Sequence, residues 1–210
     1  MIEYSNIIWD FNGTILNDVE AGIKSENTLL SRRNMPLIES VEHYHSVFTF
    51  PIIDYYKKLG HNFEKESYDD LAKEWVREYL ENVKHAMLQE GVIDLLRYFK
   101  NENCKQIILS ATEQKMLVNQ VKSLGIYDYF NDILGLDNIH AYSKIHIAKD
   151  WFSKEKPKKA LMIGDTVHDY QVAQELNVDC VLVAIGHQNY QTLKSCGVRV
   201  YHSLFECFNI

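Results

Sequence analysis

The chain lacks the features that mark a secreted, membrane-bound or nucleic-acid-binding protein. Its four cysteines are widely scattered and form no Cys-x-x-Cys pair, which argues against a zinc site or disulfide framework and favours reduced thiols in a cytoplasmic protein. No apolar run approaches membrane-spanning length, and the N-terminus has no signal-peptide pattern. With Lys+Arg 22 against Asp+Glu 29, the net charge of −7 makes nucleic acid or an anionic membrane an unexpected partner.

What is present describes a globular chain of 210 residues, 46% of them hydrophobic and 24% charged. This length suffices for one substantial core, or for a core with a smaller inserted unit. The chain has no internal repeat and no low-complexity linker. We expect a monomer or a weak homodimer.

The apolar pattern changes character twice along the chain. Residues 1–15 and 87–210 alternate short apolar runs with helical patterns, which predicts a parallel sheet covered by helices. The expected strands are Ile7–Trp9, Ile107–Leu109, Ile133–Leu134, Ala160–Ile163, Cys180–Ala184 and Val198–Tyr201. Residues with helical spacing between them include Val92–Phe99, Met116–Leu124, Ile145–Phe152 and Val172–Leu176.

Residues 16–86 have a different texture. They contain no convincing β-branched run, and their apolar residues recur at helical spacing, as in Leu71, Trp75 and Tyr79. This predicts an all-helical insert after the first strand. The expected fold is therefore α/β: a Rossmann-like parallel sheet flanked by helices (1–15 and 87–210) with a small helical cap domain (16–86).

A carboxylate directly follows the first expected strand, in the run Asp10–Thr14, which reads Asp-Phe-Asn-Gly-Thr. In open α/β sheets, ligands bind outside the carboxyl ends of the strands. The glycine lets backbone approach a ligand closely, and an aspartate at such a place can act as a nucleophile that takes up a phosphoryl group. The sequence therefore predicts a phosphate-handling site at this edge of the sheet.

Two single residues later in the chain fit such a site. Ser110 follows the strand Ile107–Leu109, where its hydroxyl and the nearby N–H groups can bind a phosphate, although a serine there also serves as a helix N-cap. Lys144 begins a helical pattern, where its ammonium can neutralise a carboxylate and a phosphoryl group, although an ordinary exposed lysine fits the pattern as well.

The run after the fourth strand carries two further acids. Ala160–Ile163 leads into Gly164 and Asp165, and Asp169 follows four residues later. Carboxylates clustered at a strand end suit Mg²⁺, a hard cation that takes oxygen ligands. The alternative is that both acids merely cap the following helix.

Together and in this order, the four segments resemble the haloacid dehalogenase-like hydrolase superfamily. Its first motif is similar to Asp-x-Asp-x-Thr, its second to a strand ending in Ser or Thr, its third to a Lys, and its fourth to Gly-Asp-x-x-x-Asp. The resemblance spans nearly the whole chain. The helical insert and the run Leu88–Val92 place it nearest to the helical-cap, phosphoglycolate-phosphatase-like branch.

The resemblance implies a phosphatase or phosphotransferase that uses Mg²⁺ and a small phosphorylated metabolite. Asp10 would attack phosphorus and form an aspartyl-phosphate. Asp10, the backbone carbonyl of Asn12, and Asp165 would hold Mg²⁺, with Asp169 near the metal or on a metal-bound water.

The same resemblance assigns the phosphate contacts. Ser110, the amide of Ala111, and Lys144 would hold the phosphoryl oxygens that are not transferred, and Thr14 would support the loop and complete the substrate-binding set. Lys144 thereby joins Asp10 and position 12 as a catalytic position.

Asn12 departs from the family pattern. In the phosphatases, the corresponding residue is an aspartate that protonates the leaving group and later deprotonates water, and an amide does neither at neutral pH. General acid–base catalysis is typically worth about 10²–10⁴-fold. We therefore expect slow turnover of ordinary phosphomonoesters, with better leaving groups tolerated.

Two other functions stay open. One is a phospho-ligand-binding or regulatory protein that has lost turnover, and the other is a different chemistry of the family, such as C–halogen or C–P cleavage. The cap would select the substrate. Its candidate contacts are the cationic Arg32, Arg33, His43, His45 and Lys57–Lys58, with an apolar wall at Phe48–Pro51.

Overall fold

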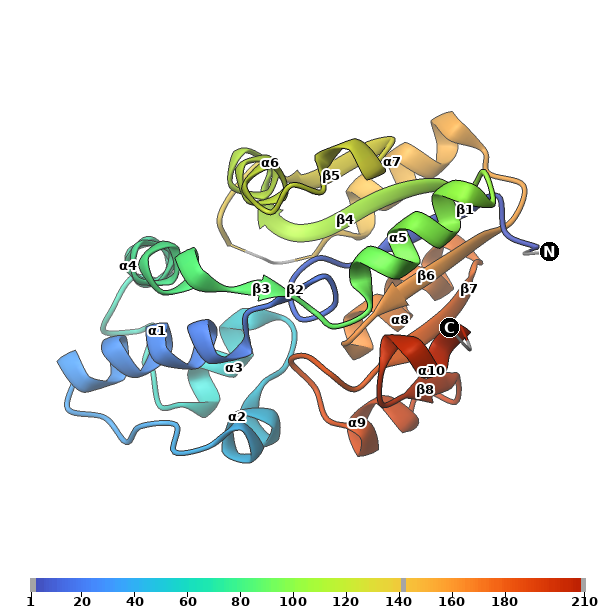
Figure 1. Ribbon diagram of the computed structural model, residues 1–210. Helices are drawn as coiled ribbons and strands as arrows, with labels where there is room; N and C mark the ends of the chain where they lie inside the picture. The colour runs from blue at the N-terminus through green and yellow to red at the C-terminus, as the bar shows by residue number, and fades with distance from the viewer. Residues whose placement is uncertain (1–2, 141–142, 209–210) are drawn as a thin grey trace.

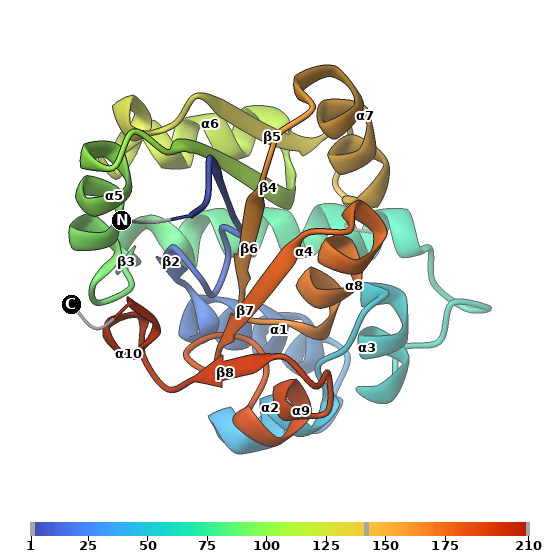
Figure 2. The same cartoon turned by 90° about the vertical axis from the view of Figure 1, so that its right-hand side faces the viewer.

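A six-stranded sheet forms the centre of the computed structural model, which describes residues 3–140 and 143–208 (Figures 1 and 2). The strands are parallel, in the order β5-β4-β1-β6-β7-β8. Their bounds are β1 (Asn6–Trp9), β4 (Lys105–Glu113), β5 (Asp132–Leu136), β6 (Ala160–Gly164), β7 (Asp179–Val183) and β8 (Arg199–Tyr201). All six predicted strands are confirmed, and so is the parallel α/β class.

Helices cover both faces of this sheet. Figure 2 shows α5 and α6 to one side of the strands and α7 and α8 to the other. The bounds are α5 (Val92–Asn101), α6 (Gln114–Ser123), η2 (Tyr127–Tyr129), α7 (Ile145–Glu155), α8 (Val167–Leu176), α9 (Tyr190–Lys194) and α10 (Leu204–Phe208). Alternate residues of β1 serve the two faces: Trp9 packs in the cluster with Phe99 of α5, and Ile8 in the cluster with Val172 of α8.

A helical insertion separates β1 from the rest of the sheet, as predicted. It leaves and re-enters through a short antiparallel pair, β2 (Leu16–Asn17) and β3 (Met87–Leu88), which the sequence did not predict. Its elements, called the cap below, are α1 (Val19–Arg32), α2 (Val41–Val47), α3 (Ile52–Lys58), α4 (Tyr68–Asn82) and η1 (Val83–His85). The cap has a buried cluster of its own, which includes Leu29 and Tyr56. The boundaries 16 and 86 remain a prediction.

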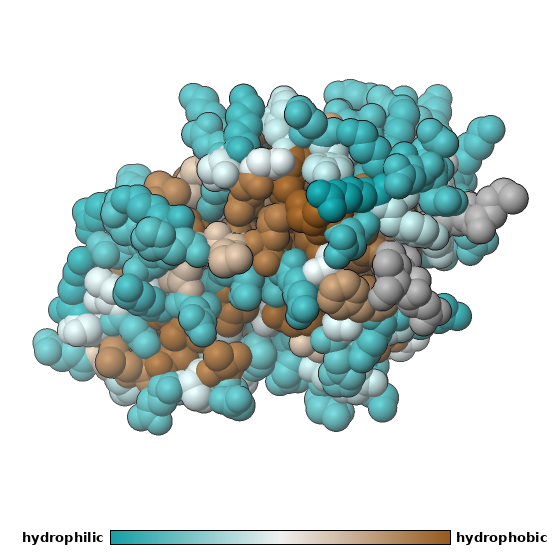
Figure 3. Space-filling model, viewed as in Figure 1, coloured by the Kyte–Doolittle hydropathy of each residue, from teal (hydrophilic) through white to brown (hydrophobic). Residues whose placement is uncertain are grey.

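The surface seen in Figure 3 is mostly hydrophilic at its periphery. Hydrophobic residues gather near the middle of this face, where the cap joins the sheet-bearing part of the molecule, and also over the lower part of the cap. Within 3–140 and 143–208, every helix is too short or too polar to cross a membrane.

Candidate active site

Asp10 lies at the carboxyl end of β1, the third strand of the sheet. Because β4 and β6 flank β1 and run parallel to it, Ser110 within β4 and Asp165 directly after β6 lie at the same edge. Asp10 is buried, and its backbone N–H donates to the carbonyl of Ile163 over 2.9 Å. Sheet topology thus joins three predicted site residues that stand far apart in the sequence.

Lys144 is buried beside Asp10. It is the N-cap residue of α7, and its Nζ contacts Asp10 Oδ1, lies 2.7 Å from Asp169 Oδ1, and donates to the Leu109 carbonyl over 2.9 Å. Burial alone would lower the pKa of Lys144, but the carboxylates of Asp10 and Asp169 raise it above its ordinary value. Lys144 is therefore a permanent cation in the site, and the exposed-lysine alternative is wrong.

Three buried carboxylates cluster at this edge, and two of them contact the ammonium. Oxygens of Asp10, Asp165 and Asp169 all lie within 4.8 Å of one another. Burial, and next the charge of Asp169, raise the pKa of Asp10 well above its usual range, against the effect of Lys144. Lys144 pairs with Asp10 and Asp169 but not with Asp165, and all the donors are hard oxygens. The residues present therefore fit a divalent cation such as Mg²⁺.

Asp165 is held in place from two sides. Thr14 donates to its Oδ1 over 2.7 Å, and the backbone N–H of His187 donates to its Oδ2 over 2.7 Å. Gly13 has a φ of 75°, and a Cβ there would collide with the Asp165 carboxylate, so this loop position requires glycine. Thr14 is not among the residues that line the cavity described below, and it supports Asp165 instead.

Asp169 has a structural role in addition to its place in the cluster. Its Oδ2 accepts from the Thr166 N–H and hydroxyl and from the Asp165 N–H, and the Thr166 side chain accepts in return, so the two residues form a capping box at the start of α8. Its Oδ1 faces Lys144. The capping alternative therefore holds for Asp169, together with a place in the charged cluster.

The side chain of Asn12 is hydrogen-bonded on every side. Its Nδ2 donates to Asp18 Oδ2 over 2.8 Å and to the Tyr79 hydroxyl over 2.9 Å. Its Oδ1 accepts from the Thr112 hydroxyl over 2.7 Å and from the Ser110 hydroxyl over 3.3 Å. The surroundings therefore suit an amide, with acceptors at its nitrogen and donors at its oxygen.

Behind Asn12, Asp18 and His187 form a buried pair. His187 Nε2 lies 3.4 Å from Asp18 Oδ1, and its Nδ1 lies 2.7 Å from the Tyr44 hydroxyl of the cap. Burial raises the pKa of Asp18, but the charge of His187 and hydrogen bonds from Tyr79 and Asn12 lower it overall. For His187, burial lowers the pKa, but Asp18 and then Asp165 raise it to about 9. Asp18 is thus ionised and does not serve as a proton donor.

Ser110 lies inside β4 and not at a helix start, because β4 runs on to Glu113 past an irregular register. The N-cap of α6 is Glu113, whose side chain accepts from the Met116 N–H, so the N-cap alternative for Ser110 is wrong. The Ser110 hydroxyl accepts from the Thr112 N–H over 3.0 Å. Ser110 and Ala111 both line the cavity with Asp10.

The site opens into a cavity of about 150 Å³ between the sheet edge and the cap. Aromatic side chains of the cap form much of its wall; they include Tyr44, Phe48, Phe50, Tyr56, Trp75 and Tyr79. The cap meets the core through stacked rings, with centroids 5.1 Å apart for Phe48 and His187 and 4.7 Å apart for Phe50 and His168.

His168 is the ring of the core against which Phe50 stacks. Burial, and next the charge of Lys144, lower its pKa to about 4, so the ring is neutral at physiological pH. Its Nε2 lies 3.2 Å from the Ser143 hydroxyl. His168 therefore contributes an uncharged aromatic face to the cavity.

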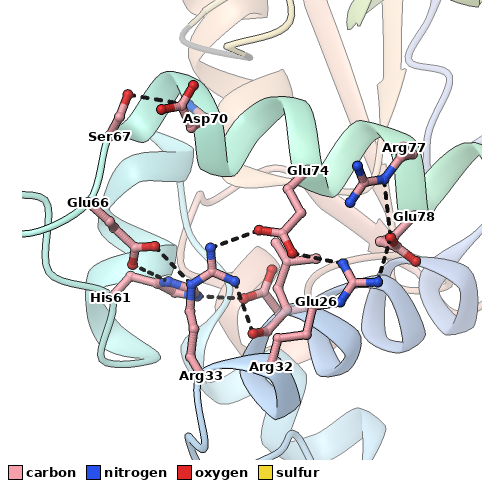
Figure 4. A network of polar contacts seen from close by, with 11 residues as sticks. Glu26, Arg32, Arg33, His61, Glu66, Ser67, Asp70, Glu74, Arg77 and Glu78 are labelled. Carbon is pink, nitrogen blue, oxygen red and sulfur yellow. Dashed lines mark hydrogen bonds and ion pairs between the residues drawn. The ribbon is translucent and has the colours of Figure 1, made fainter.

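The cationic cap residues proposed as substrate contacts do not line this cavity. Arg32 and Arg33 pair with Glu66, Glu74 and Glu78 in the network shown in Figure 4. These ion pairs hold α1 to α4 and to the segment before it. That expectation is wrong, because both guanidinium groups already have carboxylate partners within the cap.

The remaining cationic candidates of the cap also lie outside the cavity lining. Lys57 pairs with Asp54, and His45 Nε2 lies 2.9 Å from the Gly186 carbonyl, which ties the cap to the core. His43 and Lys58 are likewise absent from the lining residues. The apolar wall was predicted correctly in part, since Phe48 and Phe50 do line the cavity.

Four residues of this site were missed by sequence reasoning. His187 follows the predicted strand Cys180–Ala184, so the rule on strand ends is the signal that could have found it. Thr112 lies two residues beyond Ser110 and offered a similar signal. Asp18 and Tyr79 carried no signal, because their role depends on how the cap folds back over the sheet.

With this geometry in view, comparison with known proteins defines the class. Residues 7–183 match the family model described as haloacid dehalogenase-like hydrolase, and the chain belongs to that family. A phosphoglycolate phosphatase of Nitrosococcus oceani is 25% identical over 215 residues, which cover 97% of this chain and 95% of the relative.

Two further proteins have a similar sequence or fold. The pyrophosphatase PpaX of Listeria welshimeri is 22% identical over 178 residues, which cover 81% of this chain and 78% of the relative. Among solved structures, a haloacid dehalogenase-like family hydrolase from Streptococcus pneumoniae superposes with a TM-score of 0.77 at 20% identity, over 100% of this chain and 99% of that one. The structural likeness extends to the cap, because nearly all of both chains is covered.

Proposed function

We propose that the protein is a Mg²⁺-dependent phosphatase or phosphotransferase that acts on a small phosphorylated metabolite through an aspartyl-phosphate on Asp10. One observation carries this proposal: Asp10 faces a cavity beside a buried lysine and two further buried carboxylates. The names of the relatives, phosphoglycolate phosphatase and pyrophosphatase, support the same class of reaction.

The proposed nucleophile has one oxygen available for attack. Oδ1 of Asp10 contacts Lys144, whereas Oδ2 accepts no hydrogen bond from the residues the structure describes. Oδ2 would form a bond to phosphorus while the bond from phosphorus to the leaving oxygen breaks and that oxygen takes the electron pair. Lys144, the Ser110 hydroxyl and the Ala111 N–H would hold the other phosphoryl oxygens.

Mg²⁺ would be held by Asp10, the Asn12 backbone carbonyl and Asp165, and when bound it would neutralise charge on the phosphoryl group. Thr14 positions Asp165, and Asp169 positions Lys144. These two contacts support the proposal that Thr14 and Asp169 hold the reacting groups in place.

The second half of the reaction would return Asp10 to its free state. Water would attack phosphorus, the bond to Asp10 would break with its electron pair on the carboxylate, and dihydrogen phosphate would carry both protons of the water away. Asn12 cannot take a proton in this step, and it cannot give one in the first. Turnover would therefore be slow for poor leaving groups, by about 10²–10⁴-fold.

The test is the phosphorylated intermediate itself. Incubation with Mg²⁺ and acetyl phosphate should label a peptide containing Asp10, and Asp10→Asn should abolish both the label and turnover. Asp150→Asn, at an exposed position of α7, is the matched control and should change neither. Activity of Asp10→Asn within about tenfold of the parent would rule out the covalent mechanism, because loss of a nucleophile is usually far more severe.

A phospho-ligand-binding protein without turnover is the second candidate, favoured by the four hydrogen bonds that fit Asn12 as an amide. Under that function, phosphate compounds would bind in the presence of Mg²⁺, but Asp10 would never be labelled.

A further inference from the structure

The cavity over Asp10 is lined by aromatic side chains from the cap. Tyr44 and Phe48 come from α2 and its C-cap, Tyr56 from α3, and Trp75 and Tyr79 from α4. The rings of Trp75 and Tyr79 are themselves stacked, with centroids 4.7 Å apart. Rings from three helices thus face one small volume.

The size of the cavity suits one ring. It measures about 150 Å³. An engineered apolar cavity of about this volume in another protein binds benzene. A flat aromatic group next to the phosphoryl position would bury its faces against these rings, and such contacts add to the gain from apolar burial.

The cap elements contribute no lysine or arginine to the described lining of the cavity. Lys144 is the one lysine or arginine among the described lining residues, and it is bound to Asp10 and Asp169 at the core end. Three histidines line the cavity as well. His187 is paired with Asp18, His140 Nε2 lies 3.3 Å from Asp69 Oδ1, and the ring of His168 stacks on Phe50. A leaving group with its own carboxylate or phosphate would be desolvated there beside cations that already have acidic partners, which is unfavourable.

Asn12 adds an independent restriction on the leaving group. Because it supplies no proton, the leaving oxygen must depart as an anion. A phenolic oxygen has an ordinary pKa of about 10, against 15.7 for water, and so departs far more readily than an alkoxide. The aromatic lining of the cavity and the lack of a proton donor at Asn12 therefore both favour a phosphate ester with an aromatic leaving group.

We infer that the substrate is the phosphate monoester of a small aromatic alcohol, in which the ring occupies the aromatic cavity and the phosphate faces Asp10. This inference rests on the proposed hydrolase function and names its substrate class. In the reaction, the bond from phosphorus to the phenolic oxygen breaks as the bond from phosphorus to Asp10 forms, and the phenolate takes its proton from water after departure.

Turnover is tested with Mg²⁺ and four esters or anhydrides: phenyl phosphate, benzyl phosphate, phosphoglycolate and pyrophosphate. We expect phenyl phosphate to have the highest kcat/KM. Benzyl phosphate keeps the ring but leaves as an alkoxide, so its kcat should fall by about 10²-fold or more, while it still competes for the site. Turnover of phosphoglycolate or pyrophosphate equal to that of phenyl phosphate would overturn the inference.

Binding is tested separately, with ligands that cannot be hydrolysed. Phenylphosphonate should bind roughly 10- to 100-fold more tightly than methylphosphonate in calorimetry with Mg²⁺, from burial of the ring. Equal affinities would overturn the inference. Preferential binding of phenylphosphonate without turnover of any ester would refute the hydrolase function and still support the aromatic ligand.

A charge placed in the wall gives a third test with a matched control. Val76 of α4 lines the cavity, whereas Leu80, one turn further along the same helix, is exposed and does not. Val76→Lys should raise kcat/KM for phosphoglycolate relative to phenyl phosphate by roughly tenfold, because it supplies the missing counter-ion. Leu80→Lys should leave this ratio unchanged. The same ratio in both variants would show that the cap side does not contact the leaving group.

Discussion

The amide of Asn12 donates to the carboxylate of Asp18 over 2.8 Å, deep in the site and beside the Tyr79 hydroxyl. An aspartate at position 12 would place a second carboxylate at this distance from Asp18. Two carboxylates so close cannot both ionise freely, and the pKa of one rises strongly. Asn12 and Asp18 are therefore a complementary pair, and changing one without the other disturbs both.

This pairing gives a prediction about restoring an acid–base group. Asn12→Asp together with Asp18→Asn should raise kcat/KM for an alkyl phosphate within the range of about 10²–10⁴-fold, because the new carboxyl keeps a hydrogen-bond donor beside it. Asn12→Asp alone should gain much less. The measurement is turnover of alkyl and aryl phosphates across pH, and the gain should be largest for the alkyl esters.

Asp18→Asn alone is the control and should give no gain. Equal gains in the single and double variants would show that Asp18 is not coupled to position 12. No gain in either variant, with Mg²⁺ still bound, would favour the binding protein. Because an Asn-Gly sequence is prone to deamidation, peptide mapping of residues 12 and 13 should accompany each assay.

Mg²⁺ binding should depend on Asp165. In Asp165→Asn, one charge is lost and the new amide nitrogen faces a donor, either Thr14 or the His187 N–H. We expect Mg²⁺ affinity, measured by calorimetry, to fall by at least about 10- to 100-fold, the loss typical of residues that only support a metal site. Asp150→Asn is the exposed control. Unchanged affinity in Asp165→Asn would mean that the metal does not bind at this cluster.

The cap should lose stability as the pH rises. The buried ring of His61 lies between Glu26, at 3.0 Å, and Glu66, at 2.9 Å (Figure 4). Burial lowers the pKa of His61, but hydrogen bonds to Glu26 and Glu66 raise it overall, whereas burial raises the pKa of Glu26. Both pKa shifts favour the protonated forms of His61 and Glu26 in the folded state. The contribution of His61 is fully present below about pH 6.5 and is lost as the pH rises through its raised pKa.

Thermal unfolding followed by tryptophan fluorescence tests this dependence. Relative to His61→Gln, the parent should lose midpoint temperature between pH 6 and pH 9. A difference of about 2–4 °C corresponds to about 1 kcal/mol for a chain of this length. His85→Gln, at an exposed position, is the control and should behave like the parent. A parallel pH dependence in His61→Gln would assign the effect to other groups.

Arg33 should matter more for stability than its neighbours in the same network. It pairs with Glu66 and Glu74 at 2.8 Å and donates to the Leu29 carbonyl, and its side chain is 26% exposed. Arg33→Ala leaves these acceptors without their donor, which should lower the free energy of unfolding by about 1–3 kcal/mol. Arg77→Ala, with its side chain 68% exposed, should change it by less than about 0.5 kcal/mol in urea titrations.

The sheet could be predicted from the sequence because each strand is a short apolar run bounded by helical patterns. The elements that escaped prediction are too short for any periodicity, such as the two-residue strands β2 and β3 and the five-residue helix α9. Their positions follow from tertiary contacts. The predicted strand Ile107–Leu109 was also too short, because β4 continues to Glu113.

The central residues of the site were predictable for a topological reason. Asp10 and Asp165 follow the parallel strands β1 and β6, and Ser110 lies within β4, two residues past Ile108, the partner of Trp9, so all three reach one edge. The cap side was not predictable in the same way. Arg33 is the C-cap residue of α1 and Trp75 stands on α4. Only the packing of α1 against α4 decides that the arginine pairs with acids and that the tryptophan faces the cavity.

The two short strands β2 and β3 have a kinetic consequence. They are the covalent links between the cap and the sheet, whereas the other side of the cap is held by contacts such as the Phe48–His187 stack. The aromatic residues proposed to recognise the ligand would thus lie on a domain that moves relative to the sheet about these two short segments. If this movement limits product release, the first turnover should be faster than the steady-state rate, and product formation should show an initial burst. Tighter binding of the aromatic product would then slow its release and lower kcat. The aromatic residues that improve selectivity would thus also limit the turnover rate.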